Sequence, residues 1–265
     1  DDPTIGRLRD AGAIPIAKTN QPEMAMRLAT DNPLFGLTRN PWHPDRTASG
    51  SSGGDGSAIA SGMAPMGVGT DLGGSVRNPA YACGIAATKT SLGRLPMHGT
   101  SPAASDPLLG RQLMAVAGPM ARSVADLDAM LRVSVGRHPR DPRSVDVPHD
   151  GGHFVRRAAV PTDLPGGPIH PDAREAVRRA GEALAADGWE VVDATPPEIE
   201  RCYEVWGRLL GEDFPITLAD LDDVMSADGS HLIRASMAFW PVGEVTPQEV
   251  HVERLRLARA WALFL

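Results

Sequence analysis

The chain contains little of what marks several protein classes. Only Cys83 and Cys202 are cysteines among 265 residues, which excludes a disulfide framework and favours a reducing compartment. No apolar run approaches the roughly 18 residues that a membrane-spanning helix needs. The net charge of −7 lacks the basic footprint of nucleic-acid-binding domains. We therefore expect a cytoplasmic protein with no nucleic-acid partner and no membrane span.

Lysine and targeting signals are also scarce. Lys18 and Lys89 are the only lysines among 26 basic residues. The chain opens at Asp1 without a methionine or a leader, and it stops at Leu265 inside an apolar helical pattern. We therefore expect a piece of a longer protein that is incomplete at both ends.

Periodicity and turn residues predict alternating helices and strands, which indicates an α/β domain with a sheet covered by helices. Residues 30–56 and 136–168 are rich in Pro, Gly and polar residues and are expected to form loops. Short strands are predicted over 13–17, 66–69 and 189–192. Helices are predicted over 3–11, 22–29, 57–63, from Ser123 to Val135, and over 171–187, 198–211, 216–226, 230–239 and 247–265.

Glycine is concentrated in one stretch. Eleven of the 28 glycines fall within residues 48–96, where they alternate with serines. Because glycine is costly inside helices and strands, such a cluster implies backbone brought close to a ligand, a phosphate or other backbone.

Several motifs compete for this stretch. Gly50–Gly54 fits the G-x-S-x-G nucleophile elbow, but an elbow should follow a strand and a loop precedes it here. Gly67 and Gly69 lack the third glycine of a dinucleotide fingerprint, and the chain has no G-K-[ST] of a P-loop. His149 and His153 lack a third ligand at a sensible spacing, so we expect no metal.

The interpretation that fits the stretch as a whole is hydrolytic. Gly73, Gly74 and Ser75 offer successive backbone N–H groups that can stabilise an oxyanion. Ser75 also brings a nucleophilic hydroxyl, which needs a base, and that base can be a histidine or a lysine. The pattern predicts a serine hydrolase.

Three blocks extend this pattern: Gly50–Gly54, Gly69–Ala80 and Lys89–Arg94. Together with flanks such as Asn32–Gly36 and Gly118–Arg122, they resemble the amidase signature family of serine hydrolases. The similarity is detailed over residues 3–135 and weaker beyond.

The resemblance implies an amidase signature α/β/α fold, a mixed twisted sheet with helices on both faces. Residues 1–265 would form one partial domain of this fold. Residues 1–135 would be the signature core, 136–168 a long connection, and 169–265 a variable half that sets substrate specificity.

The family's site implies roles for individual residues. Ser75 resembles the nucleophile, and Ser51, 24 residues earlier, resembles a bridging serine that follows a cis peptide bond. The resemblance also assigns an oxyanion hole and a set of supporting residues. The oxyanion-hole residues are Leu72, Gly73 and Gly74, and the supporting residues are Thr70, Asp71 and Arg77.

Purely structural roles remain open for some of these positions. Asp71 and Arg77 could form a plain surface ion pair. Cys83 follows the nucleophile loop, but we expect it to pack in the core. The segment with Met24 resembles the border of the family's substrate channel, although core packing is an equal alternative. Its candidate substrate-binding residues are Ala25, Met26 and Leu28.

The catalytic base is not among these residues. In the family it is a lysine in a segment that would precede Asp1, and by alignment neither Lys18 nor Lys89 corresponds to it. The resemblance implies no metal and no cofactor. We expect the 265-residue piece alone to be nearly inactive.

The implied reaction is hydrolysis of a small-molecule carboxylic amide to an acid and ammonia or an amine through a serine acyl-enzyme. Three alternatives stay open: the glutaminase-like A component of a tRNA-dependent amidotransferase, an ester-cleaving or lipid-amide enzyme, and a non-catalytic homologue. Assembly as a homodimer is also open.

Overall fold

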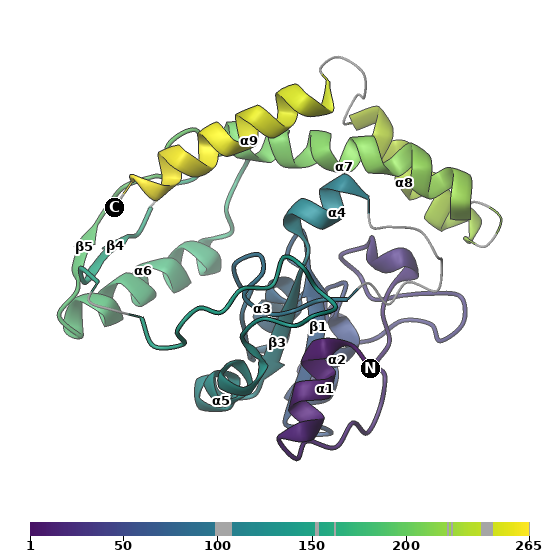
Figure 1. The fold of residues 1–265 in the computed structure, drawn as a ribbon, viewed down its shortest axis with the longest axis horizontal. Coiled ribbons are helices and arrows are strands. Elements are labelled where there is room, and N and C mark those ends of the chain that lie inside the picture. The colour runs from purple at the N-terminus through teal and green to yellow at the C-terminus, as the bar shows by residue number, and fades with distance from the viewer. Residues whose placement is uncertain are drawn as a thin grey trace. The chain divides into compact units, whose positions relative to one another are not determined.

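The computed structural model describes residues 1–98, 108–151, 154–161, 163–221, 223, 225–239 and 246–264. The chain divides into two compact units, which are described separately (Figure 1). The first is Asp1–Asp150 with Asp223–Gly229, and the second is Gly151–Asp222 with Ser230–Leu265. The division into core, connection and variable half stays a prediction.

A three-stranded antiparallel sheet forms the centre of the first unit. Its strand order is β1–β3–β2, with β1 at Met66–Asp71, β3 at Val116–Ala121 and β2 at Ala86–Ala87. Gly69 of β1 lies opposite Gly118 of β3 in the register. The central strand is buried at every residue, which places it in the core of the unit.

Helices cover one face of this sheet with α1 (Pro3–Asp10) and α5 (Val124–Ser134). Leu8 of α1 and Leu127 of α5 pack there against Ala121 of β3. Both helices begin as the sequence predicts. Asp2 caps α1 by accepting from the Thr4 N–H at 2.9 Å, and the Ser123 hydroxyl caps α5 by accepting from Asp126.

The opposite face is covered by α2 (Gly53–Ala60) and α3 (Arg77–Cys83). Ile59 of α2 packs there against Met120 of β3 and Val76. Successive residues of a strand point to opposite faces, so Met120 and Ala121 serve the two cores. Helices on both faces were expected, and the structure confirms them.

Two predicted elements in the first unit are wrong. Residues 13–17 form no strand, because no other strand in the described part of the chain pairs with this segment, and Ile14 is 82% exposed. Residues 22–29 form only the short 3₁₀ helix η1 (Glu23–Ala25). Met24 and Ala25 have φ angles of 51° and 58°, which an α-helix cannot accommodate.

Other elements had no local signal. Strand β3 carries Gly118 and Pro119 at its centre, residues that argue against a strand when seen in sequence alone. Helix α4 (Leu109–Met114) precedes it directly. In the second unit, β4 (Arg157–Ala159) lies inside the predicted connection 136–168, which corrects that part of the loop prediction.

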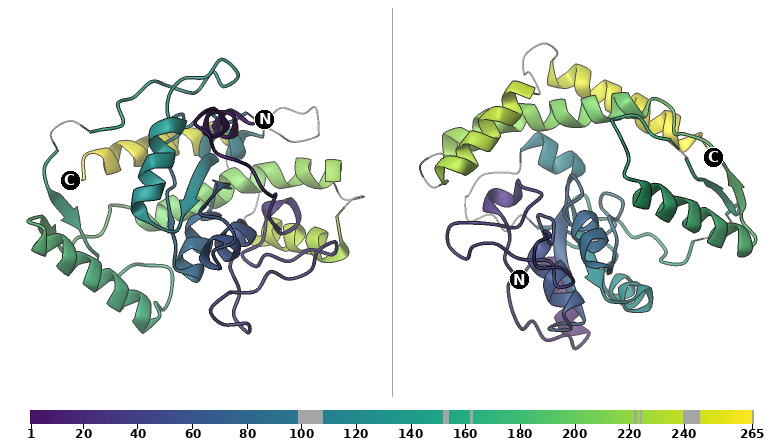
Figure 2. Two further views of the ribbon diagram at one scale, coloured as in Figure 1. Left: turned by 90° about the horizontal axis from the view of Figure 1, so that it is seen from below. Right: turned by 180° about the vertical axis from the view of Figure 1, so that it is seen from behind.

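The second unit combines a parallel pair of strands with long helices (Figure 2). Strand β4 pairs with β5 (Glu190–Val192), and α6 (Pro171–Ala186) connects them. The sequence predicted α6 and β5 but not β4. Helix α7 (Ile199–Leu221) continues through Pro215, whereas two helices were predicted there. It packs beside α9 (Pro247–Ala262), and α8 (Ala227–Phe239) lies between them in sequence.

No helix in the described ranges combines the length and apolar character needed to cross a bilayer.

Candidate active site

Two loops of the first unit meet at the predicted site. The loop that carries Ser51 leads into α2, and the loop that carries Ser75 connects β1 to α3. The Ser52 N–H donates to the Ser75 carbonyl oxygen at 2.9 Å, so the two loops are joined directly. Ser51 is buried and Ser75 is half-buried. Two serines separated by 24 residues in sequence therefore lie on adjacent loops.

The backbone at Ser51 has the geometry that the resemblance implies. The Gly50–Ser51 peptide bond is cis. Gly50 lies against the backbone of the preceding segment, because a Cβ on it would come closer than 3.0 Å to the Arg27 carbonyl oxygen. Part of the glycine cluster therefore serves the close approach of backbone to backbone, one of the options that the sequence left open.

Asp71 organises the loop that carries Ser75. Its carboxylate is fully buried and accepts from the Gly74 N–H at 2.9 Å and the Val76 N–H at 3.2 Å. The Arg77 Nε and Nη2 groups donate to the two carboxylate oxygens, each at 3.0 Å. Arg77 itself is 52% exposed at its side chain. The ion pair between Asp71 and Arg77 thus joins the buried carboxylate of the loop to an exposed side chain.

Opposing effects act on the ionisation of Asp71. Burial alone would raise its pKa, but hydrogen bonds from Arg77 and Gly74 outweigh burial and hold the pKa below its ordinary value. The hydrogen bond to Asp71 raises the pKa of Arg77 in turn. Asp71 is therefore an anion at neutral pH and keeps its acceptors for the loop amides.

The backbone N–H groups of this loop are not equivalent. The Gly74 N–H is bound to Asp71, and Gly74 has a φ of 114° that suits glycine. The N–H groups of Leu72, Gly73 and Ser75 donate to no other residue in the described part of the chain. Gly74, which the sequence placed in the oxyanion hole with Leu72 and Gly73, thus has its N–H bound to Asp71. In the described part of the chain, the N–H groups left without an acceptor on this loop are those of Leu72, Gly73 and Ser75.

Lys89 contacts the residue at which the Ser75 loop begins. Its Nζ donates to the Asp71 carbonyl oxygen at 3.2 Å and to the Met114 carbonyl oxygen at 2.9 Å. Burial lowers the pKa of this ammonium group. Lys18 is exposed. Within the described residues, neither lysine donates a hydrogen bond to Ser51 or Ser75.

The remaining predicted site residues lie at the surface. Thr70 is exposed on β1, opposite Ala117. Met26 and Leu28 are 37% and 64% exposed, so the core-packing alternative does not describe them in this structure, and Ala25 is half-buried. Their role as a pocket wall stays a prediction.

Comparison with known proteins decides the family. The family model described as Amidase matches residues 1–260. The chain belongs to the amidase signature family.

Curated relatives agree with this assignment. The chain is 42% identical over 211 residues to indoleacetamide hydrolase of Bradyrhizobium diazoefficiens, covering 78% of this chain and 40% of the relative. It is 36% identical over 231 residues to the A component of glutamyl-tRNA(Gln) amidotransferase from Roseiflexus castenholzii, covering 84% of this chain and 46% of the relative. The chain thus spans less than half of the length of these two relatives.

A solved structure confirms the amidase signature fold. The substrate complex of 6-aminohexanoate cyclic dimer hydrolase superimposes with a TM-score of 0.77 at 27% identity. The match covers 99% of this chain and 56% of that protein.

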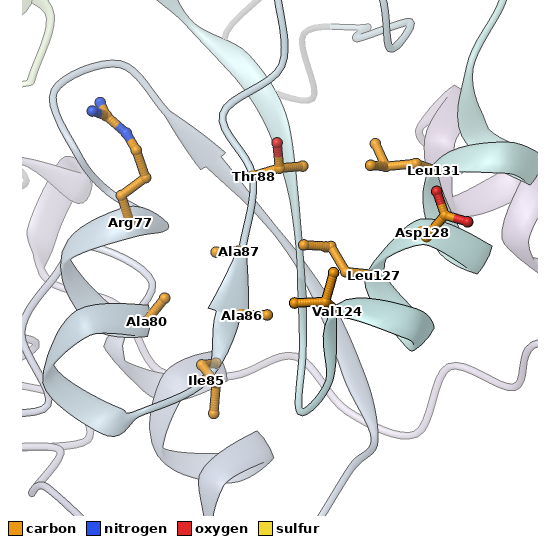
Figure 3. Close-up of a pocket in the computed structure, with 10 residues that line it drawn as sticks. All are labelled: Arg77, Ala80, Ile85, Ala86, Ala87, Thr88, Val124, Leu127, Asp128 and Leu131. Atoms are coloured by element: carbon orange, nitrogen blue, oxygen red, sulfur yellow. The ribbon is translucent and has the colours of Figure 1, made fainter. Parts of the chain in front are cut away.

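A groove on the first unit is separate from the serine loops. It has a volume of about 640 Å³ and lies between α3, β2 and α5 (Figure 3). Ala86 and Ala87 run along its floor, with Leu127 facing them from α5. Arg77 lines one end, but Ser51 and Ser75 are not among its lining residues.

Two further sequence predictions concern Cys83 and the pair His149 and His153. Cys83 is fully buried, packs with Ala48 and Ala60, and has a pKa raised by burial, as expected for a core residue. His149 contacts Asp128 at 2.7 Å, while His153 lies outside the described residues. No group of three His, Cys, Asp or Glu side chains gathers within the described ranges.

One buried residue beside the serine loops had no signal in the sequence. Thr30 lies at the start of a stretch predicted as loop, yet it is fully buried and its hydroxyl contacts the Ser51 loop. A single polar residue in a polar segment shows no periodicity, so only the contacts reveal it.

Proposed function

We propose that the protein hydrolyses a carboxylic amide to an acid and ammonia or an amine, with Ser75 as the nucleophile. The observation that carries this proposal is the junction of the two serine loops, where the Ser52 N–H donates to the Ser75 carbonyl oxygen. Beside it lie three backbone N–H groups that have no acceptor among the described residues. Membership of the amidase family supports the reaction class.

The proposed reaction starts with attack of the Ser75 Oγ on the amide carbonyl carbon. Ser51 takes the Ser75 proton and passes its own to a base. The oxyanion of the tetrahedral intermediate accepts hydrogen bonds from the N–H groups of Leu72, Gly73 and Ser75. Collapse breaks the C–N bond, and the amine leaves with the proton returned through Ser51. Water then cleaves the acyl-enzyme by the reverse path.

We propose that the base is a lysine outside residues 1–265. Lys89 is engaged by the carbonyl oxygens of Asp71 and Met114, and Lys18 lies exposed on another segment. The curated relatives are more than twice as long as the part that this chain matches. On this proposal the 265 residues alone are nearly inactive, and no metal or cofactor takes part.

The substrate is proposed to be a small-molecule amide. The hydrolase relative is more similar to this chain than the amidotransferase component is, with 42% against 36% identity. The A component of a tRNA-dependent amidotransferase remains the second candidate, and copurification with partner proteins would favour it. The unpaired state of Cys83 and Cys202 supports the proposed location in the cytoplasm. Assembly as a homodimer stays a prediction.

The test uses the full-length protein and an alkyl fluorophosphonate probe. Wild type is expected to be labelled at Ser75 and to hydrolyse members of an amide panel, whereas Ser75→Ala should lose both properties. Normal turnover by Ser75→Ala would refute the nucleophile. A wild type that neither reacts with the probe nor cleaves any amide or ester would point to the non-catalytic homologue. Preference for esters or lipid amides would identify that alternative.

A further inference from the structure

We propose that Thr30 is a positioning residue that holds Ser51 in place for proton relay. This inference rests on the proposed function, because it assigns a consequence to the relay by Ser51. Thr30 does not line the groove and belongs to none of the three signature blocks. Its hydroxyl is the only part of it that meets the Ser51 loop through hydrogen bonds among the described residues.

The hydroxyl of Thr30 binds the Ser51 loop on both sides of the serine. It donates to the Ser49 carbonyl oxygen at 2.8 Å and accepts from the Gly53 N–H at 3.1 Å. The Ser51 carbonyl oxygen lies 3.3 Å away. A hydroxyl has one proton, so the shorter approach to Ser49 is the main donor bond. One side chain thus ties residues 49 and 53 together across Ser51.

The loop is built around this hydroxyl. A Cβ on Gly53 would come closer than 3.0 Å to the Thr30 Oγ1, so glycine is required at position 53 for the contact to form. Ser49 has a φ of 63°, a left-handed conformation that residues other than glycine rarely adopt. The bond from Thr30 to the Ser49 carbonyl holds that conformation.

Thr30 is itself firmly anchored. It is fully buried, and its carbonyl oxygen accepts from the Thr38 N–H at 2.8 Å. A buried acceptor or donor that loses its partner is costly, so removal of the hydroxyl leaves the Gly53 N–H and the Ser49 carbonyl to find new partners. The loop must then move, and Ser51 moves with it.

Two substitutions of Thr30 separate the contribution of its hydroxyl from that of its side-chain volume. Thr30→Val keeps the volume and removes the hydroxyl, whereas Thr30→Ser keeps the hydroxyl and removes a methyl group. A relay displaced by about 1 Å costs on the order of 100-fold in rate. We expect Thr30→Val to lower kcat by about 100-fold with KM changed less than about twofold. Thr30→Ser should keep kcat within about threefold of wild type.

Thr4 offers a matched control in the same unit. It is also a fully buried threonine, and its hydroxyl donates to the Pro96 carbonyl oxygen at 2.9 Å, in α1 and away from the serine loops. Thr4→Val should also lower the thermal midpoint, by less than Thr30→Val because one hydrogen bond is lost and not two, and should leave kcat unchanged. This comparison separates loss of a buried hydrogen bond from loss of relay geometry.

The experiment measures kcat, KM and the rate of fluorophosphonate labelling of Ser75 for full-length wild type and the variants Thr30→Val, Thr30→Ser, Thr4→Val and Ser75→Ala. Slow labelling and low kcat in Thr30→Val, restored in Thr30→Ser, would support the proposal. If Thr30→Val does not fold, Thr30→Cys replaces it, with the same expected loss relative to Thr30→Ser.

Two results would overturn the inference. One is a folded Thr30→Val or Thr30→Cys with normal kcat and labelling. The other is a Thr30→Ser that is as slow as Thr30→Val, since the hydroxyl would then be irrelevant. Failure of the proposed function looks different: wild type and Ser75→Ala would then behave alike, whatever the Thr30 variants do.

Discussion

In the first unit, the serine loops are held by bonds between backbone groups, by the buried Asp71 carboxylate and by the buried Thr30 hydroxyl, whereas the second unit has ion pairs between its helices. The Asp71 carboxylate has no exposed surface and accepts from the amides of its own loop. In the second unit, Arg201 of α7 donates to Glu253 of α9, and both side chains are partly exposed. A buried carboxylate that accepts from the amides of its own loop leaves little freedom in residue type, whereas a partly exposed ion pair can be replaced by other polar contacts. The two regions should therefore respond differently to substitution.

The largest expected difference concerns the two acids. Asp71→Asn removes a buried carboxylate to which Arg77 and several loop amides donate hydrogen bonds. We therefore expect the first unit to lose about 3 kcal/mol of stability. Glu253→Gln breaks a partly exposed pair and should cost less than about 1 kcal/mol. Hydrogen–deuterium exchange of the full-length protein measures each unit separately. Equal protection losses in the two variants would remove the distinction.

Glycine substitutions sharpen the comparison next. Gly50→Ala forces a Cβ against the Arg27 carbonyl oxygen, which is backbone and cannot rotate away, so we expect about 2–3 kcal/mol of destabilisation. In Gly181→Ala, within α6, the new Cβ would meet the Val160 Cγ1 at 3.2 Å. There the gain in helix propensity should offset a small shift of that side chain. Thermal unfolding measures both, and a neutral Gly50→Ala would contradict the tight backbone approach.

The pH dependence of stability tests the first unit alone. The folded-state pKa of Asp71 lies below its unfolded value of about 4, so the unfolded chain takes up the proton first as the pH falls. The contribution of the ionised Asp71 to the free energy of unfolding is complete above about pH 5. It is lost as the pH decreases from about 4 through the folded-state pKa. Urea unfolding is measured between pH 3 and pH 6, with hydrogen–deuterium exchange in the first unit as the readout. The slope of unfolding free energy against pH should be shallower in Asp71→Asn than in wild type. Identical slopes would mean that Asp71 is not held as an anion.

The smallest expected effect is a gain. Gly6 lies within α1, and a Cβ on it would meet nothing within 4 Å. Gly6→Ala should therefore stabilise the first unit by about 0.5–1 kcal/mol through helix propensity. Thermal unfolding measures the shift. A destabilised Gly6→Ala would show that the first unit resists substitution even where the structure leaves room.

Much of the candidate site was visible in the sequence because its signals are local. The glycines and serines of residues 50–54 and 73–75 lie in short blocks, and the structure brings these blocks together at the Ser52–Ser75 hydrogen bond. The sequence did not show which backbone N–H groups of the loop have an acceptor and which do not. The Gly74 N–H donates to Asp71, while the N–H groups of Gly73 and Ser75 have no acceptor among the described residues, and that difference depends on the orientation of each peptide group.

By itself, the sequence determined the family, the reaction class that the family suggests, and the helices whose caps and periodicity are local, such as α1, α5 and α6. Only the tertiary structure decided that residues 13–17 form no strand, that a strand runs through Pro119, and that Thr30 supports the Ser51 loop. The physical reason is the range of the interactions. A cap is completed within four residues, whereas a strand needs a partner and a buried hydroxyl needs acceptors that distant segments supply.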